Sequence, residues 1–177
     1  PYSVLRGEGL LLSASNVQVK GYLFKGWEVS NVFGLAPMEN AVLLQPGETY
    51  VPESNVNIWA RYVESRTVTL SVAGSSGQSG SYLFYEDVVE KDAEYTLPVV
   101  DYVPTGYEFV GWYVGSIEDL VQGGYAPAGG VQYDSETGKF SAGGQVLKNQ
   151  GETLTVDDDV AVVAIYVKTD FGAVTIA

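Results

Sequence analysis

The stretch Gly106–Trp112, with the sequence GYEFVGW, repeats an earlier stretch, Gly21–Trp27, with the sequence GYLFKGW, at five of seven positions. The two stretches lie 85 positions apart, and internal similarity at a fixed separation is the sequence signature of repeat architectures. A second pair of similar stretches, Gly47–Val63 and Gly151–Val167, aligns without a gap. We therefore interpret the chain as two copies of one module.

The two copies set the expected domain boundaries. The first module is predicted over residues 1–64 and the second over residues 65–168. The second copy opens with Arg66–Val72, whose alternating polar and apolar residues are typical of a half-buried strand. The first copy has no counterpart of this stretch, so we predict that the first module lacks its N-terminal strand and exposes a sheet edge.

The C-terminal residues 169–177 are expected to begin a third module or to form a docked strand, because residues 172–177 resemble Arg66–Ser71. We predict that residues 173–176 pair with a sheet edge. That edge would belong to the second copy or, by strand donation, to the first copy of a neighbouring molecule.

Composition and local patterns favour β structure with many turns. Aromatic residues make up 12% of the chain, with 13 Tyr and 21 Gly, a composition that suits strands and turns better than a helical bundle. Residues 86–94 fit either one short helix or a strand, a turn and a second strand. Ser116–Val121 has a helix-capping pattern and is predicted to form a short helix.

Charge and residue usage exclude several functions. The net charge of −13 disfavours binding to nucleic acid or to anionic lipid, because both need clustered Lys and Arg. No apolar run is long enough to insert into a membrane. Cys and His are absent, which removes thiol nucleophiles, disulfides, ordinary zinc sites and triads of the Ser-His-Asp type.

Acidic side chains supply no catalytic or metal site in the sequence. Asp157–Asp159 lacks the spaced oxygen ligands of a calcium loop and is interpreted as a solvated turn. Glu118 and Asp119 are neighbours on a predicted helix start, whereas a glycosidase needs two carboxylates that face each other. We predict no enzymatic activity, no metal and no cofactor.

The copies differ most in the spacer between the conserved Trp and the Gly-Glu-Thr sequence. The spacer covers residues 28–46 in the first copy and residues 113–150 in the second. The enlarged spacer contains the candidate ligand-binding aromatic residues Tyr113, Tyr125, Tyr133 and Phe140. Insertions on a rigid scaffold often carry recognition, but these aromatics could instead cover a sheet face.

The last strand of each copy predicts what the enlarged spacer covers. One strand face is apolar in both copies. The opposite face reads Asn57, Trp59, Arg61 and Val63 in the first copy but Ala161, Val163, Ile165 and Val167 in the second. A strand that is apolar on both faces should be covered on both, so we expect the enlarged spacer or a neighbouring module over this second face.

Taken together, Thr67–Leu70, the Gly- and Ser-rich loop after it, Tyr95–Pro98, Gly106–Tyr113 and the closing strand Val160–Tyr166 resemble the Listeria-Bacteroides repeat of the internalin B-repeat type. The resemblance covers the second copy, apart from its enlarged spacer, and most of the first. It implies a β-rich α+β fold of two tandem small β-grasp-like modules on secreted or wall-attached bacterial surface proteins. It implies no enzymatic activity and supplies no functional-site residues.

These observations lead to an expected function. The chain is predicted to be a non-catalytic spacer or adhesion region of an extracellular, bacterial cell-surface protein. Its expected partners are neighbouring repeat modules and a host or cell-wall protein or glycan. Two alternatives are a glycan- or protein-binding module that uses the enlarged spacer, and an accessory domain of an extracellular polysaccharide-degrading enzyme.

Overall fold

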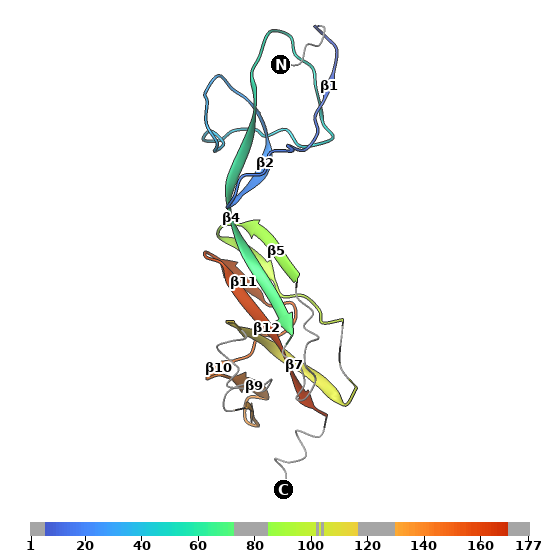
Figure 1. The fold of residues 1–177 in the computed structure, drawn as a ribbon, viewed down its shortest axis with the longest axis vertical. Coiled ribbons are helices and arrows are strands. Elements are labelled where there is room, and N and C mark those ends of the chain that lie inside the picture. The colour runs from blue at the N-terminus through green and yellow to red at the C-terminus, as the bar shows by residue number, and fades with distance from the viewer. Residues whose placement is uncertain (1–5, 73–84, 102, 104, 117–129, 170–177) are drawn as a thin grey trace. The chain divides into compact units, whose positions relative to one another are not determined.

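A computed structural model describes residues 6–72, 85–101, 103, 105–116 and 130–169 of the chain (Figure 1). The chain divides into two compact units, residues 1–65 (unit 1) and residues 66–177 (unit 2). The predicted C-terminal strand at residues 173–176 and most of the predicted helix at Ser116–Val121 lie outside the described residues.

Unit 1 is built from two antiparallel strand pairs. Strand β2 (Tyr22–Val29) pairs with the first half of the long strand β4 (Ile58–Val72). The short strands β1 (Leu10–Leu11) and β3 (Thr49–Tyr50) form the second pair.

Unit 2 uses the second half of β4 as its first strand. This half pairs in parallel with the last strand, β12 (Val160–Lys168), which in turn pairs antiparallel with β7 (Tyr107–Val114). Strand β5 (Tyr85–Glu90) also pairs with β4, and β6 (Ala93–Thr96) pairs antiparallel with β11 (Thr153–Val156). A separate sheet contains β8 (Val131–Asp134), β9 (Lys139–Ala142) and β10 (Gln145–Val146).

The strand with the Gly-Trp sequence pairs with the last strand of its copy in the same register in both units. In unit 1 Phe24 lies opposite Tyr62 and Trp27 lies opposite Ala60, and in unit 2 Phe109 lies opposite Tyr166 and Trp112 opposite Ala164. Both strand pairs shift register by one residue just before the glycine of the Gly-Trp sequence. The two similar heptapeptides therefore form the same bulged strand pair.

The glycine before each Trp is required by its surroundings. Gly111 has a φ of 153°, and a Cβ added to it would lie 2.6 Å from the Cβ of Leu147. Gly26 has a φ of 149°, and its added Cβ would lie 2.9 Å from the Cβ of Leu43. Such a glycine marks a close approach between the bulged strand and another segment of the chain.

The spacer segment that approaches each glycine is held by hydrogen bonds to the following Trp. The backbone of Trp112 exchanges two hydrogen bonds with Lys148, of 2.7 and 2.9 Å, and Trp27 exchanges two with Leu44, of 2.9 and 2.8 Å. In both units the Trp ring packs edge-on against the preceding Phe, with ring centroids 5.5 Å apart in unit 1 and 5.7 Å apart in unit 2. The glycine and the Trp backbone thus hold the spacer segment against the strand pair, while the Trp and Phe rings pack against each other.

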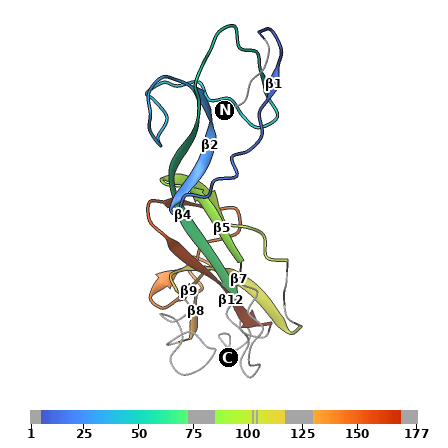
Figure 2. The ribbon, with the colours of Figure 1, turned by 45° about the horizontal axis from the view of Figure 1, so that its top comes forward.

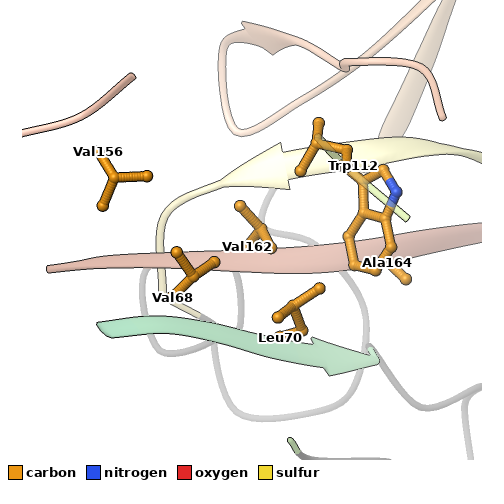
Figure 3. Packing of buried hydrophobic residues seen from close by; sticks show 7 residues of the cluster. Val68, Leu70, Trp112, Val156, Val162 and Ala164 are labelled. Atoms are coloured by element: carbon orange, nitrogen blue, oxygen red, sulfur yellow. The ribbon is translucent and has the colours of Figure 1, made fainter. Parts of the chain in front are cut away.

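The larger core belongs to unit 2. Figure 3 shows Val68 and Leu70 of β4 beside Val162 of β12 and the Trp112 ring. All these side chains are buried, together with Leu97, Val156 and Ala164. The β-branched residues that dominate this core suit the pleated, buried surface of a parallel strand pair.

The expected α+β, β-grasp-like fold is wrong, because the described part of the chain contains strands, turns and loops but no helix. Residues 86–94, for which a helix was one option, form strand β5, a turn and the start of β6. Asp92 has a φ of 65° at that turn, which ends the first strand and starts the second. The local reason is that only a short run of residues in this segment fits a helical face, which is too little for a stable helix.

Candidate functional site

The enlarged spacer of unit 2 is the candidate site that the sequence indicates. Its described residues form the sheet of β8, β9 and β10, and Figure 2 shows β8 and β9 in the half of unit 2 that also carries β7 and β12. Gln145 fixes this sheet to β7, because its side-chain amide accepts from the Val114 N–H at 2.7 Å and donates to the Val114 carbonyl at 3.0 Å.

The structure does not place the described candidate aromatics together on one exposed surface. Tyr113 is 9% exposed and lies in a core cluster. Tyr133 and Phe140 form a ring pair across β8 and β9, with centroids 4.9 Å apart, and only Tyr133 of these two is well exposed, at 38%. Tyr125 lies outside the described residues. Of the three described aromatics, Tyr133 and Phe140 thus form a ring pair, and Phe140 also packs against the buried cluster that contains Tyr113.

The spacer does cover the second face of β12, as the strand pattern predicts. Tyr113, Val163 and Ile165 from the main sheet pack with Ala142 and Leu147 of the spacer. Phe140 and Val131 pack against this cluster from the spacer sheet. Phe140 and Tyr113 therefore have a structural task, which is to shield a strand that is apolar on both faces.

A groove beside the described part of the enlarged spacer is small. It has a volume of about 190 Å³ and is lined in part by Phe140, Lys139, Lys148 and Glu152. Pockets for small organic ligands usually enclose about 300 to 1,000 Å³. Of the three predicted aromatics that the structure describes, Phe140 lines this groove, and Tyr113 and Tyr133 do not.

A tight turn between β8 and β9 orders the tip of the spacer. The Asp134 carboxylate accepts hydrogen bonds from the Thr137 hydroxyl and from the Glu136 N–H, both at 2.9 Å. These two bonds, with the Thr137 hydroxyl first, hold the pKa of the Asp134 carboxyl below its ordinary value of 3.8. Asp134 is thus a turn-forming residue, and its low pKa has a local structural cause.

The acidic run Asp157–Asp159 also has a structural role. The Asp159 carboxylate accepts from the Thr67 N–H at 2.8 Å, and the Asp157 carbonyl accepts from Arg66 Nε at 3.1 Å. No group of three or more Asp and Glu side chains in the described residues could hold a metal ion. The turn therefore positions the beginning of the second half of β4 beside β12.

Unit 1 contains a buried ion pair that the sequence did not reveal. Arg61 is fully buried, Glu28 is 4% exposed, and Arg61 Nε lies 2.5 Å from Glu28 Oε2. The two terminal nitrogens of the Arg61 guanidinium donate to the carbonyl oxygens of Gly34 and Val32. The second carboxylate oxygen of Glu28 accepts from the Met38 N–H. The sequence alone gives no sign of this pairing, because Glu28 lies on β2, 33 positions before Arg61 on β4.

No family model, no curated protein and no solved structure matches the chain. Among the described residues there is also no helix long and apolar enough to cross a membrane.

Proposed function

We propose that this chain is a non-catalytic repeat region that acts as a spacer within a bacterial cell-surface protein, where it holds other parts away from the surface. The observation that carries this proposal is the occurrence of one bulged strand pair twice, in one register, with the same hydrogen bonds around each Gly-Trp sequence. Tandem modules of this kind extend a chain by repetition, and each module contributes length without needing a reactive site.

The connection between the copies supports a spacer role. Residues 63–66, which join the two units, all belong to strand β4 and include no glycine or proline. A connection with regular backbone structure has less conformational freedom than a flexible linker. The net charge of −13 would keep such a spacer soluble at high local concentration.

The inserted segment of the second copy, in its described residues 113–116 and 130–150, gives no comparable support for a binding role. Of the described candidate aromatics, Tyr113 and Phe140 pack in or against the core cluster, and only Tyr133, whose ring pairs with Phe140, is well exposed. For this reason we propose the spacer role and not ligand binding at the second copy.

The proposal requires the two units to keep a fixed arrangement, and small-angle X-ray scattering can test this. We expect the scattering of the wild-type chain to fit a single arrangement of the units. The matched control carries a six-residue Gly-Ser insertion between Glu64 and Ser65, and we expect it to show the broader distance distribution of two independently moving units. Indistinguishable distance distributions, beyond the small added mass, would contradict the spacer proposal.

A further inference from the structure

The first half of β4 has one edge that no described strand covers. Asn57 accepts a hydrogen bond from Ser30 on the side of β2, so Asn57, Trp59 and Arg61 direct their backbone groups toward β2. Backbone N–H and C=O groups of successive residues point to alternate edges of a strand, so those of Ile58 and Ala60 point to the edge opposite β2. Ile58 and Ala60 lie opposite Val29 and Trp27 of β2, and the other described partners of β4, which are β5 and β12, lie beside its second half (Figure 1).

This open edge ends at Tyr62. The Tyr62 N–H points to the same side as those of Ile58 and Ala60, and it donates to the Leu35 carbonyl at 2.8 Å. The loop that contains Leu35 thus closes the edge beyond Ala60. The stretch that remains, residues 56–60, is long enough to pair with a strand of about five residues.

Unit 2 shows what covers the equivalent edge. Residues 160–164 of β12 correspond to residues 56–60 of β4, because both strands have the same register with their Gly-Trp strand. In unit 2 this edge pairs in parallel with Val68–Val72, from Val160 opposite Val68 to Ala164 opposite Val72. The covering strand is therefore the first strand of the module.

The side chains of that first strand complete the core. Val68 and Leu70 are buried at 0% and 1% exposure, and they pack with Val162 and Ala164. In unit 1 the counterparts of Val162 and Ala164, which are Ile58 and Ala60, are only partly buried. Val56 is 38% exposed, so an apolar strip lies along the open edge.

We propose that residues 56–60 of β4 form an acceptor site for an extended strand from another module of this repeat type. The strand runs parallel to β4 and carries apolar residues at the positions of Val68 and Leu70, with small polar residues between them. Main-chain hydrogen bonds to the edge supply affinity, and the two apolar side chains supply specificity by entering the incomplete core of unit 1.

A synthetic peptide with the sequence of residues 66–72, carrying an N-terminal dye, tests the proposal against the whole chain. Fluorescence anisotropy should show saturable binding with one peptide per chain. The matched control peptide has the same composition, with its apolar and polar positions exchanged, so that the apolar side chains face away from the core. We expect the control to bind at least tenfold more weakly. Equal binding of both peptides would overturn the proposal.

Hydrogen exchange of backbone amides shows where on the chain the peptide binds. The amides of Ile58 and Ala60 should become at least tenfold more protected in the presence of the peptide, while the amide of Trp59, already directed at β2, should change little. Protection confined to other segments would overturn the assignment of the site.

A pair of substitutions at the edge completes the test. Ile58→Pro removes an N–H that points away from β2, so it should weaken peptide binding at least tenfold while leaving the pairing with β2 in place. Ile58→Val keeps the N–H and should bind the peptide within threefold of the wild type. Unchanged binding by a folded Ile58→Pro protein would overturn the proposal, and if that protein does not fold, the two peptides on the wild-type chain decide.

Discussion

Arg61 and Glu28 show how one residue pair replaces an apolar cluster. In the shared register Arg61 corresponds to Ile165 and Glu28 to Tyr113, which both lie in the cluster beneath the spacer of unit 2. With the short spacer of the first copy, the same space is filled by a loop whose carbonyl groups accept from Arg61. No buried polar side-chain atom among the described residues lacks a hydrogen-bond partner, which offsets part of the desolvation cost of burying the two charges.

Removing one member of this pair should be costly. Arg61→Met leaves the Glu28 carboxylate buried without its partner, and we expect the free energy of unfolding of unit 1 to fall by about 3 to 5 kcal/mol. The double variant Arg61→Met with Glu28→Leu should recover much of this loss. Urea unfolding followed by tryptophan fluorescence measures both.

The matched control for this experiment is Arg66→Met. Arg66 is partly exposed, and its ion pair with the exposed Asp158 is long, at 4.0 Å. We expect this substitution to cost at most about 1 kcal/mol, as is usual for surface pairs. If Arg61→Met cost no more than Arg66→Met, the buried pair would not stabilise unit 1.

At the scale of elements, the hairpin of β8 and β9 depends on its turn. Because the folded pKa of Asp134 is lowered, its ionised form stabilises the turn above the ordinary pKa of 3.8, and this contribution is lost as the pH falls through the lower folded value. Thr137→Val removes the hydroxyl donor and should raise the pKa of Asp134 toward 3.8. Side-chain carboxyl NMR titration measures the change.

Ser135→Ala is the control in the same turn, because it leaves the Thr137 hydroxyl and the Glu136 N–H in place. It should leave the pKa of Asp134 within about 0.3 of the wild-type value, well inside the usual spread of carboxyl pKa values. An equal rise in both variants would show that the Thr137 hydroxyl is not the cause.

The sequence predicted the strands that repeat but not the fold class. The alternation in Arg66–Val72 and the two heptapeptides give β4, β2 and β7, because a period of two depends only on neighbouring residues. The absence of a helix over residues 86–94 depends on the turn at Asp92, whose positive φ is not visible in the residue type. The resemblance to a β-grasp-like family therefore gave the wrong class.

The candidate site was predicted only in part, because the sequence does not show which of its side chains are buried. The apolar second face of β12 correctly indicated that the spacer packs there. The sequence could not separate Tyr113, which is buried, from Tyr133, which is exposed, since both are tyrosines in a glycine-rich insertion. Nor could it reveal the burial of Arg61, which depends on an acidic residue 33 positions away.

For the molecule as a whole, the two units differ in how much core they bury. Among the described residues, the buried hydrophobic residues of unit 1 are Leu12 and Tyr62, whereas unit 2 contributes the other 13 of the 15. Buried apolar surface is the main favourable contribution to folding. We therefore expect unit 1 to be the less stable of the two.

This difference predicts unfolding in two stages. As urea is increased, the amides of β2 should lose protection from hydrogen exchange at a lower concentration than those of β7, although the two strands have the same register and a similar sequence. Mass spectrometry of the peptides that contain residues 22–29 and 107–114 follows both. A simultaneous loss of protection would show that the units unfold as one cooperative body.

The parallel pairing of β4 with β12 has a mechanical consequence for unit 2. If unit 2 were pulled between Arg66 and Lys168, the force would act along two adjacent strands that point the same way. The hydrogen bonds between Val68–Val72 and Val160–Ala164 would then be strained together, in shear, and would have to break nearly at once, whereas the bonds of a hairpin pulled open from one end break in turn. The parallel pairing of the first and last strands of unit 2 would therefore make this unit resist tension applied along the chain.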